Sequence, residues 1–319
     1  MPKNKHKENL DENRLRLTSF VTFLMGFSQA VLVYVMSSYF KLATGTESVG
    51  IFYGVSYAIY LVILLNLHKL VRMFGKSNIF YFSLLTNIAV ATGLIYTDPS
   101  MLGVALLMLY IIMEHVAWVA LDVIVESFSV DKMSGRIRGL HLTIFNAGFL
   151  FGPFASTYIL GELGYHGIFI FALIFNCFVF IFGLIGFRNI NHKFEQRLKV
   201  LDMLRKVATK KDILRIYHIS FVLDFFFALM TIYMPIYLRD LGYSWENIGW
   251  IFTAMLVPFV LLQYPIGILA DKKTGEKEFL LFAILMMAIA TITIYFIGTG
   301  SMMVWAIVLF ATRIGAALI

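Results

Sequence analysis

The chain has 319 residues, of which 60% are hydrophobic and only 14% are charged, and its mean hydropathy is +0.82. Because about 25% of the residues in an average water-soluble domain are charged, a single soluble core is excluded. The net charge of +7 would suit nucleic-acid binding in a soluble protein, but the basic residues lie mostly in alternate connecting segments, which membrane topology explains better. We therefore expect the lipid bilayer, and no nucleic acid, as a partner.

Apolar stretches that are long enough to cross a hydrocarbon core of about 30 Å recur along the whole chain. They must be helices, because lipid satisfies no backbone hydrogen bonds and the alternating pattern of a membrane barrel is absent. The fold class is therefore all-α membrane, with about ten transmembrane helices. The predicted spans are residues 18–38, 50–66, 79–96, 102–126, 140–160, 168–187, 217–238, 248–269, 279–298 and 302–319.

The polar tail at residues 1–17 is too long for the n-region of a cleaved signal peptide. With this tail inside, the cytoplasmic segments hold 23 of the 26 Lys and Arg residues. Lys41 and Arg239 lie on the opposite side, and Arg313 lies within the last span. Because Lys and Arg in short loops set orientation, we expect a multi-pass protein of the cell (inner) membrane, the plasma membrane, with a cytoplasmic N-terminus.

The longest connecting segment, residues 188–216, is rich in Lys and Arg, with apolar residues at nearly helical spacing. It is either an amphipathic helix on the inner leaflet or a solvated linker. It separates a six-helix half, residues 18–187, from four further helices at residues 217–319. No Walker loop, His-x-x-x-His pair, G-x-S-x-G elbow or Cys-x-x-Cys occurs, so we expect no cofactor, no metal and no enzymatic activity.

The chain also contains an internal repeat. Residues 39–42 followed by 48–50 correspond to residues 237–240 followed by 247–249, at an offset of 198 to 199 positions. This pattern predicts two parallel copies of a six-helix unit, in which the second copy lacks its last two helices. We expect the chain to be a fragment of a longer protein.

The stretch Gly267-Ile-Leu-Ala-Asp271-Lys-Lys-Thr-Gly275-Glu-Lys277 resembles the signature loop between the second and third helices of each half of the major facilitator superfamily (MFS), here in its second-half position. Between Asp271 and Gly275 this sequence has one residue more than the family's signature loop. The resemblance implies that Gly267 permits close helix contact and that Lys272 and Lys277 remain in water. The first-half counterpart at residues 67–76 keeps the terminal glycine and the basic residues but lacks the acid.

The same resemblance implies that Asp271 latches the cytoplasmic face by contacting the start of the fifth span at Arg138 and Gly139, where the helix dipole and the arginine both favour a carboxylate. The alternative is an ordinary turn on the positive side of the membrane. Before the fifth span, Asp122 and Glu126 share a helical face, and Arg72, Arg136 and Arg138 are their candidate basic partners. We interpret this charged group as structural gating, and the alternative is substrate binding.

On the fifth span, Gly139, Gly148, Gly152 and Pro153 match the spacing of the family's antiporter-associated motif. The motif continues with two further glycines, which this sequence lacks. Small residues let helices approach closely, and Pro153 removes a backbone hydrogen bond, which produces a bend suited to alternating access. The resemblance slightly favours efflux by an antiporter. The alternative is a set of packing glycines with a tolerated proline.

Charged residues within the membrane are costly unless they face water or a partner. Glu114, Asp224 and Arg313 lie in the fourth, seventh and tenth spans, which in this family line the central cavity, and Glu114 and Arg313 are 199 positions apart. We hypothesise that Glu114 exchanges a proton with the cavity, tuned by His115, and that Asp224 is a second titrating or substrate-binding acid. Burial disfavours the charged form of a carboxyl group, as proton coupling requires. The alternative is a static pair between Glu114 and Arg313.

The resemblance implies a secondary active transporter that moves a small organic solute by alternating access, with H⁺ as the coupling ion. The competing interpretation is a non-transporting membrane protein, such as a sensor, a scaffold or a degenerate remnant, that has kept the architecture.

Overall fold

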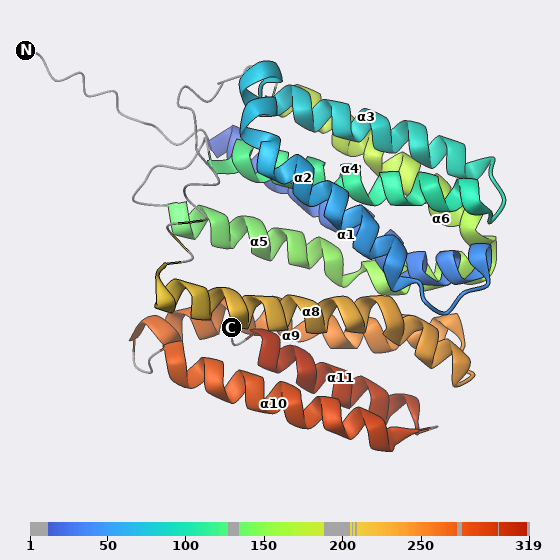
Figure 1. Cartoon of the computed structure of the whole chain (residues 1–319), viewed down its shortest axis with the longest axis vertical. Coiled ribbons are helices and arrows are strands. Elements are labelled where there is room, and N and C mark those ends of the chain that lie inside the picture. Colours follow the sequence, from blue (N-terminus) through green and yellow to red (C-terminus); the bar gives the residue numbers. More distant parts are fainter. Residues whose placement is uncertain are drawn as a thin grey trace, which may run out of the picture.

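A computed structural model of the chain shows an all-helical bundle (Figure 1). The structure describes residues 12–126, 134–187, 205, 207, 209–272, 276–298 and 300–317, and it places the side chains of 16–126, 140–187, 205, 207, 209–262, 281–298 and 300–315. The predicted linker at residues 188–216 falls largely outside the described residues, so its conformation stays a prediction.

The helices form two groups that lie side by side with their axes nearly parallel (Figure 1). The first group contains α1 (Glu12–Thr44), α2 (Gly50–Phe74), α3 (Lys76–Ile95), α4 (Met101–Glu126), α5 (Ser134–Leu150) and α6 (Gly152–Phe187). The second group contains α8 (Lys211–Asp240), α9 (Trp245–Lys272), α10 (Glu276–Ile297) and α11 (Met302–Ala317). These groups are called the first and second halves below.

Seven stretches of the described residues are long and apolar enough to cross a bilayer, and Leu281–Ile297 and Met302–Gly315 are shorter apolar helices. One of the seven, Leu140–Phe187, has 48 residues. At 1.5 Å per residue it is about twice as long as a hydrocarbon core is thick, so it holds two passes. The predicted all-α membrane fold is confirmed.

The helix boundaries between residues 134 and 187 differ from the predicted spans at 140–160 and 168–187. A new helix begins at Gly152, two residues after the end of α5, because Pro153 has no backbone N–H to donate to the preceding turn. The chain then reverses at Gly164, whose φ of 63° is in the left-handed region that glycine adopts without strain. The break therefore falls in the middle of the fifth span, and the reversal follows at a glycine.

The two ends of the bundle are named here by their connections. The tail end is where α1, α5 and α8 begin and where α2, α4 and α6 finish; it lies at the left in Figure 1. The hairpin end, at the right, carries the short α1–α2, α3–α4, α8–α9 and α10–α11 connections.

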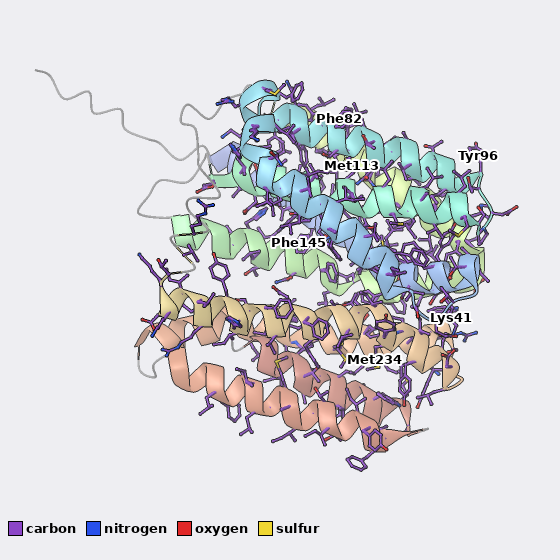
Figure 2. The ribbon with its side chains drawn as sticks, viewed as in Figure 1. Lys41, Phe82, Tyr96, Met113, Phe145 and Met234 are labelled. Atoms are coloured by element: carbon purple, nitrogen blue, oxygen red, sulfur yellow. The ribbon has the colours of Figure 1, made fainter. Side chains whose placement is uncertain are left out.

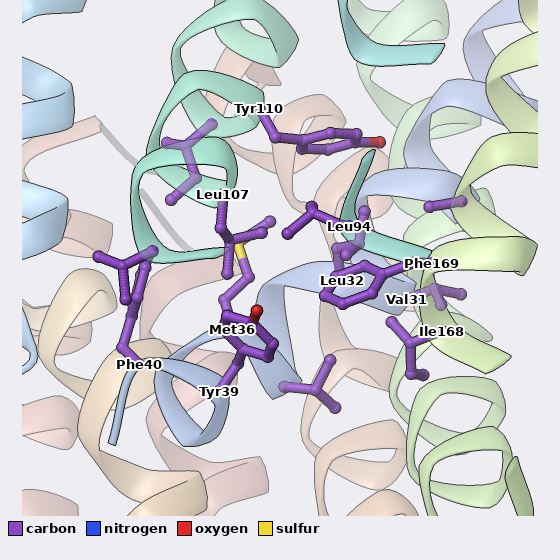
Figure 3. Packing of buried hydrophobic residues seen from close by; sticks show 14 of the residues in the cluster. Val31, Leu32, Met36, Tyr39, Phe40, Leu94, Leu107, Tyr110, Ile168 and Phe169 are labelled. Atoms are coloured by element: carbon purple, nitrogen blue, oxygen red, sulfur yellow. The ribbon is translucent and has the colours of Figure 1, made fainter. Parts of the chain in front are cut away.

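Buried apolar side chains join the two halves near the hairpin end. One cluster contains Tyr39, Tyr110 and Phe169 of the first half (Figure 3). The same cluster includes Ile232 and Ile236 of α8. A second cluster places Tyr34 of α1 among residues of α8, α9 and α11. Nearer the tail end, by contrast, the clusters among the described residues each belong to one half.

Candidate functional site

Glu114 is an acidic residue buried within the first half. It lies near the middle of α4 and is only 5% exposed. Tyr110, one helical turn before it, and Tyr57 of α2 are close enough to interact with the carboxylate electrostatically. Among the described residues, no hydrogen-bond donor or cation lies within bonding distance of this carboxylate. A fixed anion in such a place within a membrane is costly.

An ordered polar and aromatic shell surrounds Glu114. His115 Nδ1 donates a hydrogen bond to the carbonyl oxygen of Ile111 at 2.8 Å, and its ring lies 5.0 Å from the ring of Tyr57. Asn176 of α6 donates to the hydroxyl oxygen of Tyr110 at 2.6 Å. The sequence hypothesis did not include the two tyrosines, although Tyr110 could have been found from its position four residues before Glu114 on the same helical face.

Arg313 is buried in the second half, on α11, where it is 4% exposed. Its guanidinium carbon lies 4.4 Å from the ring centre of Phe227 and 5.6 Å from that of Phe259. Its Nε has no hydrogen-bond partner among the described residues. A cation held by ring faces in this way gains up to about 2 kcal/mol, which offsets only part of its desolvation.

No ion pair joins Glu114 to Arg313 in the part of the chain that the structure describes. Glu114, on α4, lies near α2 of the first half, whereas Arg313 packs against α8 and α9 of the second half. The static pair that the sequence left open as an alternative is therefore not formed. Their equivalence in the repeat places them at similar depth without bringing them into contact.

Asp224 is exposed on α8 and lies toward the tail end. It precedes Ala228 by four residues and Ile232 by eight, so all three share one helical face. Ala228 and Ile232 pack against the first half in the cluster at the hairpin end. The same face of α8 thus contacts the other half at one end of the bundle and is uncovered at Asp224.

Glycines bring α1 unusually close to α5 and to the start of α6. A Cβ atom at Gly148 would lie 2.2 Å from the carbonyl oxygen of Phe23, and one at Gly152 would lie 2.0 Å from the Cβ of Ala30. From the other side, a Cβ at Gly26 of α1 would lie 2.3 Å from the carbonyl oxygen of Phe145. At Gly148 and Gly152 the helices approach too closely for a side chain, and Gly26, which the sequence hypothesis did not include, has the same surroundings.

The motif residues at the tail end are placed only by their helices. Gly267, Asp271 and Lys272 lie in the last turns of α9, which ends at Lys272, and Lys277 lies in the first turn of α10. Arg136, Arg138 and Gly139 lie in the first turns of α5. The side chains of all these residues, and Gly275 entirely, are outside the described residues, so the predicted latch stays a prediction.

The acidic pair at the end of α4 has a neighbour that the sequence hypothesis missed. Lys76, the first residue of α3, is 6% exposed and lies within electrostatic reach of Glu126. Asp122, on the same helix α4 as Glu126, is half-buried. A basic residue at the start of α3 and an acidic residue at the end of α4 thus lie near each other at the tail end, whereas the gating role of the predicted charged group stays a prediction.

Residues 14–319 match the sequence profile of the Major Facilitator Superfamily. Among solved structures, a D-xylose–proton symporter superposes with a TM-score of 0.70 at 14% identity, over 97% of this chain and 80% of that one. A bacterial homologue of the human lysosomal transporter Spinster, in an inward-facing and unoccupied conformation, superposes with a TM-score of 0.64 at 11% identity, over 96% of this chain and 74% of that one. No similar curated protein sequence was found.

At these identities the structural likenesses show the fold, whereas the profile match covers nearly the whole chain. The chain belongs to the Major Facilitator Superfamily of secondary transporters.

Proposed function

We propose that this chain moves a small organic solute across the cell membrane by alternating access, coupled to the movement of protons through Glu114. The observation that carries the proposal is the burial of this carboxyl group within a membrane-spanning helix, with no cation or hydrogen-bond donor in reach among the described residues. Burial disfavours the charged form of a carboxyl group, and a fixed charge within a membrane is costly.

The proposed orientation puts the tail end in the cytoplasm. The Lys and Arg residues of the chain gather in the segments at this end, and this asymmetry decides how spans insert. The hairpin end then faces the opposite side of the membrane.

The packing between the halves supports a state that is closed at the hairpin end. Phe154 of α6 and Trp250 of α9 have ring centres 4.9 Å apart, and a Cβ at Gly249 would lie 2.0 Å from the Oγ1 atom of Thr157. Nearer the tail end, the face of α8 that carries Asp224 is exposed. The proposed cycle separates the halves at the hairpin end and brings them together at the tail end, with Asp224 able to meet solute or solvent in the present state.

Efflux is the proposed direction, supported by the glycines and Pro153 in the fifth span. Close contact between α1 and α5, followed by the helix break at Gly152, gives the first half a rigid part and a bend. The break lies within the first half, where it lets the fifth span bend while the two halves rock against each other.

The test uses the purified chain in vesicles that carry an imposed pH gradient, with a panel of radiolabelled sugars, amino acids and amphiphilic organic cations. We expect at least one solute to move against its own gradient, and we expect Glu114→Gln to abolish this movement while exchange down the solute gradient persists. Glu162→Gln is the matched control, because Glu162 is exposed on α6 and undergoes the same chemical change.

Unchanged coupling in Glu114→Gln would overturn the role of Glu114. If no solute of the panel responded to the gradient in the wild-type chain, the result would favour the non-transporting alternative. A pH-dependent infrared difference spectrum of the carboxyl C=O stretch, compared between wild type and Glu114→Gln, reports the protonation of this residue without any solute.

A further inference from the structure

A cluster of three charged side chains joins the halves at the hairpin end. Lys41, in the last turn of α1, places its Nζ 3.0 Å from Oδ1 and 3.2 Å from Oδ2 of Asp240, the last residue of α8. The same Nζ lies 3.0 Å from Oε1 of Glu47, in the connection that leads to α2. Figure 2 shows Lys41 at this end of the bundle, beside the end of α8.

The two carboxylates differ in which half they belong to. Glu47 is six residues from Lys41 in the first half, so the two move together when the halves rotate. Asp240 belongs to the second half and must leave Lys41 when the hairpin end opens. The cation is 30% exposed, compared with 57% for Asp240 and 72% for Glu47, so it is the most enclosed member of the cluster.

The internal repeat explains why these residues meet. Lys41 and Asp240 are 199 positions apart, within one residue of equivalent places in the two copies. In parallel repeats related by an axis along the membrane normal, equivalent helix ends come together where the helices lie beside that axis, as α1 and α8 do here. The two copies have placed opposite charges at this meeting point, where identical charges would repel each other.

A second polar contact ties the same two halves together, between α2 and α8. The backbone N–H of Gly50, at the start of α2, donates to the hydroxyl oxygen of Tyr233 on α8 at 3.2 Å. A Cβ at Gly50 would lie 2.4 Å from that oxygen, so the position has no room for a side chain in this state. Ile232 and Ile236, near Tyr233 in α8, belong to the apolar cluster that joins the halves at this end.

We propose that Lys41, Asp240 and Glu47 are gating residues that position the two halves during transport: Asp240 holds Lys41 in the state closed at the hairpin end, and Glu47 keeps Lys41 paired after Asp240 has left. This inference rests on the alternating-access function proposed above. Opening then exchanges two anionic partners for one and never leaves the lysine without an anion. Because exposed ion pairs shift an equilibrium by no more than about fivefold, the latch biases the cycle without blocking it.

Replacing the two acidic residues should therefore shift the open population in opposite directions. Asp240 acts only in the closed state, so Asp240→Asn should raise the open population up to about fivefold. Glu47 matters most in the open state, where it is the remaining partner of Lys41, so Glu47→Gln should lower that population. A cluster that merely stabilised the fold would respond in the same direction to both changes.

Opening is measured in the full chain with Ile236→Cys in a Cys177→Ser background. Ile236 is 6% exposed and packs against the first half, so a thiol there is reached only when the halves separate. Detergent-permeabilised membranes are treated with a hydrophilic maleimide, which reaches both ends of the bundle and makes the assay independent of orientation. No solute is added.

We expect Asp240→Asn to label faster and Glu47→Gln to label more slowly than the parent. At about 1 M salt, where the Debye length is about 3 Å, the differences should shrink. Equal rates in all three proteins, or faster labelling in both variants, would overturn the latch. Either result would leave the proposed solute transport standing, since flux in vesicles is measured separately.

Discussion

The close contact between α1 and α5 makes Gly148→Ala the sharpest test of the packing. The added methyl group would lie 2.2 Å from the carbonyl oxygen of Phe23 and 3.1 Å from the backbone nitrogen of Phe27. Both are backbone atoms of α1, so no side chain can rotate away, and the helices must move apart by about 1 Å to restore an ordinary contact of about 3.5 Å. Overpacking of this kind costs about 1 to 3 kcal/mol.

Gly161→Ala on α6 is the matched control, because a Cβ there meets nothing within 4 Å. Alanine is favoured over glycine in a helix by about 1 kcal/mol, and both variants gain this amount. Gly161→Ala should therefore be more stable than the wild type, and Gly148→Ala less stable than Gly161→Ala by the full overpacking cost. At about 2 to 4 °C per kcal/mol, the two should differ by several degrees in apparent Tm.

The assay is thermal unfolding of the purified chain in detergent, followed by tryptophan fluorescence at one fixed scan rate, since unfolding of membrane proteins is often irreversible. If Gly148→Ala melted together with Gly161→Ala, α1 and α5 would not be as close as the structure places them. A lower Tm for both variants would point instead to a general intolerance of α5 and α6 to substitution.

Two further predictions concern the charged residues of the second half. Asp224→Cys, on the exposed side of α8, should react with a hydrophilic maleimide much faster than Leu223→Cys, whose side chain is 8% exposed; equal labelling of the two neighbours, each in the Cys177→Ser background, would contradict the placement of Asp224. Arg313→Met should abolish transport without lowering the apparent Tm. The Tm should hold because removing an incompletely paired buried charge relieves several kcal/mol of desolvation, whereas the lost contact with Phe227 and Phe259 is worth only about 2 kcal/mol. A fall of more than a few degrees would assign Arg313 to the fold.

Much of the fold follows from local sequence, because lipid allows a long apolar segment few conformations. The all-helical membrane class was predicted from hydropathy, and the structure confirms it. Close packing at Gly148 and Gly152 was likewise predicted from the spacing of small residues. The helix break at Gly152 was predicted only as a bend, because a proline indicates a disturbed helix but does not show whether the helix kinks or a new helix begins.

For the charged residues, too, the sequence identified the positions but not their surroundings. Glu114 and Arg313 could be found from sequence because a charge within an apolar span is rare and costly. That Glu114 lies among tyrosines and Arg313 among phenylalanines depends on how each helix is rotated about its axis. Hydropathy carries little information on this rotation when all sides of a helix are apolar.

By itself, the sequence determined the class of fold, the number and approximate place of the spans and the repeat, because these depend on the local balance between apolar surface and charge. Only the tertiary structure decided which repeat-related residues meet. Lys41 and Asp240 are almost 200 positions apart, and their contact exists because the two halves dock at the hairpin end. Contacts between halves depend on the state of the transporter, whereas the helices within each half persist throughout the cycle.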